Sequence, residues 1–227
     1  MINIWGLFFT ILLFLLIKKY NKIKYLKKLP AMFITSILLI IFLKTTNISY
    51  DSYNSSACYL TLLLGPATIA LGYPLYVNRS VLLNNKRAIY FGFVVATIVA
   101  IFSTYIFAKL SHFDFQITNS LIPKSVTAPI ALEISKMIGG IPEITACIVA
   151  ITGLFGAVFG HKILSWFHVK SDVAKGLSIG AASHVLGTAS CIEKNKPKQV
   201  VMATISLIII GILTTVFCLI FFQIKLQ

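Results

Sequence analysis

The segment that decides the fold class is Val200–Phe222, VVMATISLIIIGILTTVFCLIFF, which contains no Asp, Glu, Lys or Arg. An uncharged apolar run of about 18 residues or more is typical of a helix that crosses a lipid bilayer. Working outward from this segment, Ile89–Ala108 and Ile144–Gly160 are uncharged runs of the same kind. The sequence therefore predicts an all-α protein, a polytopic transmembrane helical bundle.

The composition excludes a soluble globular domain. Of the 227 residues, 58% are hydrophobic and 11% are charged, with a mean hydropathy of +0.91, whereas an average soluble domain has about 25% charged residues. The formal charge is +14, but the basic residues lie between the apolar runs and lack the clustered Arg, Gly and aromatic pattern of a nucleic-acid surface. Basic loops beside spans follow the positive-inside rule. We therefore expect the lipid bilayer, and no nucleic acid, as a partner.

The N-terminal region is expected to hold a retained helix rather than a secretory signal. No Lys or Arg precedes the apolar run Ile2–Ile17, and six Lys follow it within Lys18–Lys28. This order places the Lys cluster in the cytoplasm and the N-terminus outside. A second run, Ala31–Leu43, is short for a span, Ile48–Ser56 is polar and expected outside, and Cys58–Val77 is apolar but interrupted by Gly and Pro.

The start of the second half predicts a helix that covers only part of the bilayer. After a polar bridge at Asp114–Ser120, the stretch Pro123–Pro129, PKSVTAP, precedes the apolar segment Ile130–Ile138 and a Gly pair. At 1.5 Å per residue, such a helix spans only about half of a ~30 Å hydrocarbon core. We interpret it as a half-helix or re-entrant segment.

Gly and Pro mark the expected helix ends and breaks. Ser125 or Thr127 is expected as the N-cap of the half-helix, because a hydroxyl can accept from the free N–H groups of the first turn. Pro suits that first turn, and a Gly pair suits the end. The residues expected to break or end helices are Gly65, Pro66, Pro129, Gly139, Gly140, Gly180 and Gly187. Unwound backbone is tolerated in a bilayer only where protein or a water-filled cavity covers it.

The chain shows a short internal repeat within one integral membrane domain, 1–227. Gly65–Gly72 and Gly180–Gly187 lie 115 residues apart and share the pattern G-x-A-[ST]-x-x-L-G. Each is the Gly-interrupted segment of its half, 1–112 or 113–227. Paired interrupted segments point to the binding site of a transporter. The charge pattern leaves open whether the repeats are inverted or parallel.

The interrupted segments hold the candidate substrate-binding side chains. Half-helix N-termini present free N–H groups and the positive end of the helix dipole, which suit a carboxylate. The candidates beside them are Thr68, Lys124, Ser125, Thr127, Ser183, His184 and Thr188. The alternative for each single hydroxyl is close helix packing. Three such segments in one small chain favour a substrate or ion pathway.

The ionisable residues in these segments have two interpretations each. His184 is either a proton carrier or anion contact, or a hydrogen-bonded structural residue. Lys124 is either an anion contact or an interfacial anchor. Glu133 and Lys136 are three residues apart and share a helix face. They line a polar pathway or lie at the interface, and we favour the pathway.

The sequence predicts no enzyme, no cofactor and no metal site. It contains no GxSxG elbow, Walker loop or paired catalytic carboxylates, and its four Cys are far apart without CxxC spacing. Gly153, Gly156 and Gly160 place small residues along one span. This spacing favours helix packing, either within the chain or between chains.

Four short stretches of the sequence occur in an order that resembles a known protein family. They are LGPATIAL at 64–71, PKSVTAPIA at 123–131, GGIP at 139–142 and ASHVLGTA at 182–189. In this order they resemble the LrgB/CidB family of bacterial membrane proteins, from about residue 60 to the C-terminus. Val185 stands where many members have Gly, and a bulkier residue there is expected to narrow the site.

The resemblance implies an inner-membrane protein described as holin- or antiholin-like, linked to murein hydrolase control and cell lysis. It implies a small partner of the LrgA/CidA type, and similarity to plastid glycolate/glycerate and bacterial pyruvate transporters. Our leading hypothesis is a transporter of small carboxylates, expected to be a homo-oligomer. The alternatives are a holin- or antiholin-like factor that forms or regulates a pore without a specific substrate, and a scaffold for the partner.

Overall fold

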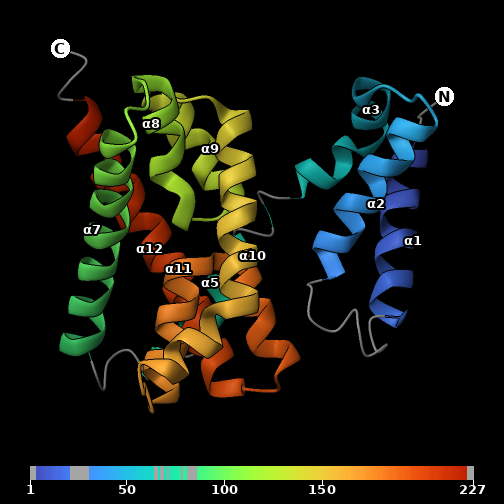
Figure 1. The fold of residues 1–227 in the computed structure, drawn as a ribbon. Coiled ribbons are helices and arrows are strands. Elements are labelled where there is room, and N and C mark those ends of the chain that lie inside the picture. Colours follow the sequence, from blue (N-terminus) through green and yellow to red (C-terminus); the bar gives the residue numbers. More distant parts are fainter. Residues whose placement is uncertain are drawn as a thin grey trace. The chain divides into compact units, whose positions relative to one another are not determined.

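The computed structural model describes residues 4–20, 31–63, 66, 69–70, 72–77, 79–80 and 86–223. All regular secondary structure within these residues is helical, as the sequence predicts (Figure 1). The chain forms two compact units, Met1–Ala70 and Leu71–Gln227. This boundary differs from that of the proposed repeat halves. Because half of the first repeat copy lies outside the described residues, the repeat stays a prediction.

The first unit consists of α1 (Trp5–Tyr20), α2 (Ala31–Thr45) and α3 (Tyr50–Leu62). Helices α1 and α3 are joined by polar contacts: the Gly6 N–H donates to Ser56 Oγ at 3.1 Å, and Thr10 Oγ1 lies 2.8 Å from the Tyr53 hydroxyl. The ring of Phe9 packs on that of Phe42 of α2, with centroids 4.4 Å apart. Helix α1 therefore contacts both other helices of this unit.

Two polar stretches that the sequence marks as connections are largely helical. Most of Ile48–Ser56 lies in α3, which begins after Ser49, and the Ser49 hydroxyl accepts from the Ser52 N–H at 3.3 Å. Most of Asp114–Ser120 lies in α8 (Phe115–Leu121), where the Asp114 carboxylate accepts from the Ile117 N–H at 2.7 Å. Low hydropathy concealed these helices, because their start signals are capping side chains rather than apolar periodicity.

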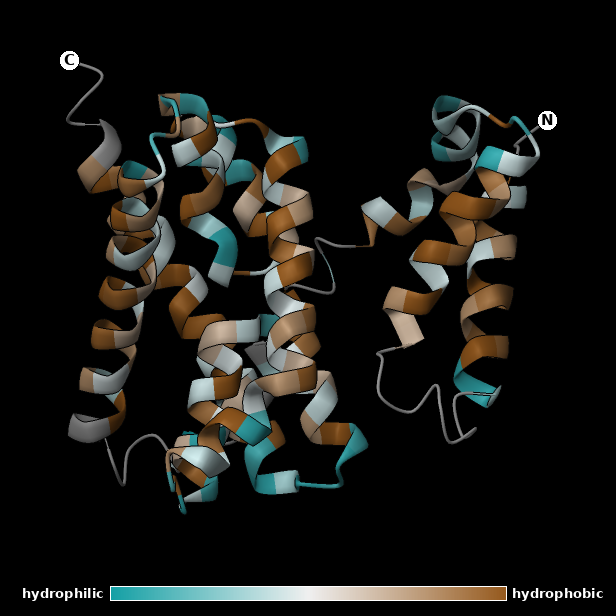
Figure 2. Ribbon diagram, in the orientation of Figure 1, coloured by the Kyte–Doolittle hydropathy of each residue, from teal (hydrophilic) through white to brown (hydrophobic). Residues whose placement is uncertain are grey.

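The second unit contains the remaining described helices. They are α5 (Gly72–Val77), α7 (Lys86–Leu110), α8, the 3₁₀ turn η2 (Ile122–Ser125), α9 (Ala128–Met137), α10 (Pro142–Trp166), α11 (Asp172–Glu193) and α12 (Pro197–Gln223). By length and composition, three segments of the described chain can cross a membrane: Ile89–Leu110, Pro142–Trp166 and Pro197–Phe221. Figure 2 shows apolar residues along α7, α10 and α12, with hydrophilic residues gathered at the loops of this unit.

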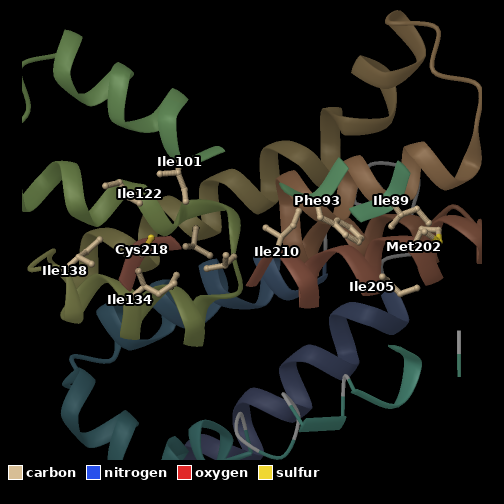
Figure 3. Close-up of a cluster of buried hydrophobic side chains, with 13 residues drawn as sticks. Ile89, Phe93, Ile101, Ile122, Ile134, Ile138, Met202, Ile205, Ile210 and Cys218 are labelled. Atoms are coloured by element: carbon tan, nitrogen blue, oxygen red, sulfur yellow. The ribbon is translucent and has the colours of Figure 1, made fainter. Parts of the chain in front are cut away.

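Helix α12 is the centre of the second unit and packs against α5, α7, α9 and α11. The buried apolar cluster draws Ile89, Phe93 and Ile101 from α7, Ile134 from α9, and α12 residues that include Met202, Ile205, Ile210 and Cys218 (Figure 3). Lipid chains are as apolar as these side chains, so close van der Waals packing, rather than burial from water, holds such helices together. This cluster fixes the frame around which α9, α10 and α11 are arranged.

Candidate functional site

Helix α11 is interrupted at His184. This residue has φ 40° and ψ −128° within an otherwise helical segment, a backbone conformation that residues with a Cβ seldom adopt. His184 is 4% exposed, and its Nε2 lies 3.1 Å from the carbonyl oxygen of Val149 in α10. Thr188 Oγ1 donates to the His184 carbonyl oxygen at 3.0 Å. Both the side chain and the backbone of His184 are therefore held by neighbouring groups.

The interruption is not at the glycines that were expected to cause it. Gly180 and Gly187 both keep helical backbone, and His184 lies between them. Gly180 faces α12, where an added Cβ would overlap the backbone of Ala203, and a Cβ on Gly187 would lie 2.7 Å from Ser183 Cβ. Their small size serves close packing, and the break falls on a larger residue.

The interrupted part of α11 packs against small residues of α10. A Cβ on Gly153 would lie 2.6 Å from His184 Cε1, and a Cβ on Gly156 would overlap Ser183 Oγ. The α10 glycine face is thus occupied by α11 of the same chain. This answers, for Gly153 and Gly156, the question that the sequence left open between packing within a chain and between chains.

The entry to α9 places two hydroxyls beside a helix N-terminus. Thr127 is the N-cap with extended backbone and Pro129 lies in the first turn, while Ser125 ends η2 instead of capping α9. Ser125 and Thr127 are each 8% exposed, and neither hydroxyl has a hydrogen-bond partner among the described residues. Since the first N–H groups of a helix have no partner within the helix, this entry presents donors and the positive end of the α9 dipole.

The exit from α9 is a Schellman turn at the predicted Gly pair. Gly139 has φ +75°, and the N–H groups of Gly139 and Gly140 donate to the carbonyl oxygens of Lys136 and Ser135 at 3.3 and 2.7 Å. Helix α9 has ten residues, a length of about 15 Å at 1.5 Å per residue. It is a half-helix, as the Pro and Gly spacing predicts.

A buried polar network fixes this turn against α8 and α10. Thr145 Oγ1 lies 2.9 Å from the Ser120 carbonyl oxygen and 2.7 Å from Ser135 Oγ, and Ser120 Oγ accepts from the Ile141 N–H at 2.7 Å. The Asn119 side-chain amide donates to the carbonyl oxygen of Ile138. These hydrogen bonds satisfy backbone groups that the end of a helix leaves free.

Lys124 projects into a cavity of about 320 Å³ between α7 and α10. The lining residues are Ser103, Thr104, Phe107, Leu121, Lys124, Ile148 and Thr152. Lys124 Nζ donates to Thr104 Oγ1 and lies 3.5 Å from the Ala100 carbonyl oxygen. Among the described residues no carboxylate is paired with this ammonium group. Lys124 is half-buried.

A second cavity, of about 240 Å³, lies between α10 and α11. Its walls are Thr152, Phe155, Gly156, Gly160, Ile163 and Leu164 from α10, and Ser178, Ile179, Ala182 and Ser183 from α11. Ser183 is the candidate residue that lines it, whereas the His184 side chain is directed to Val149 instead. The candidates are therefore distributed over two cavities and a helix entry, with η2 in contact with both α10 and α11.

One predicted pair lies apart from these cavities, and part of the first interrupted segment lies outside the described residues. Glu133 and Lys136 form an ion pair of 2.8 Å, with side chains 68% and 57% exposed, so the expectation that they line an internal pathway is not supported. Gly65 and Thr68 lie outside the described residues, and Pro66 is helical and exposed.

Several polar residues of the site were missed in the sequence. Ser103, Thr104 and Thr152 line the Lys124 cavity, and Asn119, Ser120, Ser135 and Thr145 form the network at the α9 exit. Each hydroxyl lies in a helix without a spacing motif. The sequence signal for this network is the polar stretch 114–120, whose low hydropathy indicates a connection rather than a helix.

These features define a class: a polytopic helical membrane protein that contains a half-helix, an interrupted helix and two cavities. Among the described residues, no group of three or more His, Cys, Asp or Glu lies close enough to hold a metal ion. Within the described part of the chain, the geometry offers the Lys124 cation, several hydroxyls and free backbone N–H groups.

Residues 10–224 match the LrgB-like family, and the chain belongs to this family of antiholin-like membrane proteins. Uncharacterized protein YwbG of Bacillus subtilis (strain 168) is 35% identical over 214 residues, 94% of each chain. Antiholin-like protein LrgB of Bacillus mycoides (strain KBAB4) is 37% identical over 185 residues, 82% of this chain and 80% of the relative. No solved structure matches the chain. The resemblance drawn from the sequence motifs is confirmed, and the family is not a known enzyme family.

Proposed function

We propose that this protein carries small carboxylates, of the pyruvate or glycolate type, across the bacterial cytoplasmic membrane. The observation that supports this most is Lys124, a half-buried cation in a cavity with hydroxyls and, among the described residues, no acidic partner. A charged side chain within a bilayer costs about 2.5–3.5 kcal/mol on insertion scales. A bound carboxylate offsets part of this cost, because ammonium–carboxylate hydrogen bonds are about twice as strong as neutral ones.

The other candidates extend the same chemistry. Ser125 and Thr127 present free hydroxyls at the positive end of α9, and Ser183 lines the cavity beside the interrupted part of α11. In this proposal His184 holds the backbone of the break through Val149, and its imidazole is a positioning group rather than a direct substrate contact.

An antiholin-like role is the rival function, and the printed names of several relatives favour it. In that case the protein acts in the membrane with copies of itself and with a small LrgA/CidA-like partner, and controls murein hydrolases and lysis through a pore. Such a pore produces leakage that does not saturate with solute concentration. A carrier produces saturable uptake, and the lysis effect is then downstream of transport or parallel to it.

The test is reconstitution of the purified protein in liposomes, with uptake of labelled pyruvate and glycolate measured with and without a pH gradient. We expect saturable uptake. Lys124→Met should reduce uptake at least tenfold at equal protein incorporation, because it removes the only charge among the described residues of the cavity wall. The matched control is Lys136→Met, which removes an exposed lysine outside both cavities and should leave uptake unchanged.

The outcomes separate the two functions. Unsaturable leakage of several unrelated solutes supports the pore. Saturable uptake that needs an LrgA/CidA-like protein in the same liposomes supports a carrier with a partner. Absence of uptake with and without that partner overturns the transport proposal, and full uptake by Lys124→Met overturns the assignment of the site.

A further inference from the structure

The two cavities of the second unit share one residue, Thr152 of α10. The cavity that holds Lys124 contacts α10 at Ile148 and Thr152. The cavity that holds Ser183 begins at Thr152 and continues along α10 to Leu164. Along the axis of α10, the two cavities therefore lie on opposite sides of Thr152.

The charges of the flanking segments assign the two cavities to different halves of the bilayer. Lys162 lies near the end of α10, and Lys170 and Lys175 follow in the next connection and the first turns of α11. By the positive-inside rule this end faces the cytoplasm. Helix α7 runs the opposite way, with Lys86 and Arg87 at its start.

The Lys124 cavity is lined by the later part of α7, from Ser103 to Phe107. That part of α7 is distant from the basic residues at the start of the helix. Ile148 is likewise distant from the basic residue near the end of α10. Two antiparallel helices thus place the Lys124 cavity in the outer half and the Ser183 cavity in the inner half.

At the junction, the Thr152 hydroxyl has no hydrogen-bond partner among the described residues. Threonines in other helices of this chain donate to the carbonyl oxygen four residues earlier, as Thr104 does to Ala100 at 2.7 Å and Thr204 to Val200 at 2.9 Å. Thr152 makes no such bond within the described chain and is half-buried. The next residue, Gly153, packs against His184, so the junction lies beside the break in α11.

We infer that the two cavities are the outer and inner chambers of one permeation route, and that Thr152 is the constriction between them. This inference rests on the proposed transport function. A carboxylate enters beside Lys124, passes Thr152 while accepting a hydrogen bond from its hydroxyl, and reaches the chamber lined by Ser178 and Ser183. The side chain of Thr152 then limits the cross-section of the route without contributing charge.

The first experiment enlarges the side chain at the constriction, which narrows the route. Thr152→Trp should reduce pyruvate and glycolate uptake in proteoliposomes at least tenfold, whereas Thr152→Ser should retain it. The matched control is Ile151→Trp, since Ile151 is the neighbouring residue, is 59% exposed and lines neither cavity. Uptake by Thr152→Trp equal to that of the wild type overturns the inference while leaving the transport proposal intact.

The second experiment does not depend on uptake. It tests the inference even if the Thr152→Trp variant fails to fold. In protein with Cys58 and Cys147 replaced by Ser, single cysteines are introduced as Ser103→Cys and Ser178→Cys. In oriented vesicles, a membrane-impermeant maleimide should label Ser103→Cys from outside only and Ser178→Cys from inside only, after subtraction of the labelling of the parent protein. Labelling of both from the same side, or of neither, overturns the two-chamber arrangement. If the wild-type protein shows no uptake while the two cysteines are still labelled from opposite sides, the transport function is contradicted and the two-chamber arrangement is not.

Discussion

The two interruptions in the second unit are built in opposite ways. In α11 a single residue, His184, departs from helical backbone, and glycines of α10 make room for it. Between α9 and α10 the chain leaves the helix through a Gly pair, and a buried network around Thr145 binds the freed backbone groups. Steric fit is the larger contribution at the first interruption, and hydrogen bonding is the larger contribution at the second. Added volume should therefore damage the first, and loss of a donor should damage the second.

The largest effect is expected from added volume at the α10–α11 contact. Gly156→Val should destabilise the protein by about 3 kcal/mol, because its side chain would overlap Ser183 and overpacking typically costs about 1–3 kcal/mol. Thermal unfolding in detergent measures the change. Gly92→Val in α7 is the control, since no atom of the described residues lies within 4 Å of a Cβ there.

A second substitution at Ser183 tests whether the loss of stability arises from the contact between positions 156 and 183. Gly156→Ala combined with Ser183→Gly should be more stable than Gly156→Ala alone, because the second change removes the atoms that the new methyl group meets. Additive losses in the double variant would show that the two residues are not in contact.

The next effect is loss of a donor at the α9–α10 turn. Thr145→Val preserves shape but leaves the Ser120 carbonyl oxygen and Ser135 Oγ without their partner. An unsatisfied buried polar group costs about 1–3 kcal/mol, so we expect a lower unfolding temperature. Thr215→Val should have a smaller effect, since Thr215 donates only to the Gly211 carbonyl oxygen within its own helix. Equal effects of the two substitutions would contradict a special role of the network.

A smaller effect distinguishes backbone from side chain at His184. Both His184→Ala and His184→Gly remove the contact with Val149, but only Gly relieves the positive φ. Since a left-handed backbone costs a residue with a Cβ about 1–2 kcal/mol, His184→Gly should be the more stable variant by about 1 kcal/mol. In a regular helix the order would be reversed, because Gly is less favourable there by about 0.5–1 kcal/mol.

The smallest effect is a pH dependence at the start of α11, far from both interruptions. The Gln199 side-chain amide donates to Asp172 Oδ1 at 2.7 Å and, with nearby Lys196, Lys175 and Lys198, holds the pKa of Asp172 below its ordinary value. Stability from this group is present above the unfolded-state pKa and is lost as pH falls through the lower, folded-state pKa. The difference in unfolding temperature between wild type and Asp172→Ala should therefore shrink from about pH 7 to about pH 3. A difference that stays constant would show that the carboxylate charge has no part in it.

The long apolar helices and the half-helix could be predicted from the sequence, since their signals are local. Uncharged runs define α7, α10 and α12, and a Pro followed by a Gly pair predicts α9 with its Schellman turn. Local signals fail where a contact joins distant residues. The partners of Thr145 lie 25 and 10 residues away, and Lys124 meets a threonine 20 residues earlier. No spacing rule selects those hydroxyls from the many others in apolar helices.

The position of the break in α11 shows the same limit. Glycine predicts a break because it is permissive, yet Gly180 and Gly187 are used for close approach, and the strained backbone falls on His184. The imidazole there is stabilised by the Val149 carbonyl oxygen of another helix, a contact that composition and motif cannot indicate.

The overlap between Gly156 and Ser183 also has an evolutionary consequence. A lineage that acquires a side chain at position 156 must shorten the one at position 183, or separate the helices and lose the break that lies one residue further on. The two positions should therefore covary across LrgB-like proteins, with the sum of their side-chain volumes kept small even where each residue differs from the one found here.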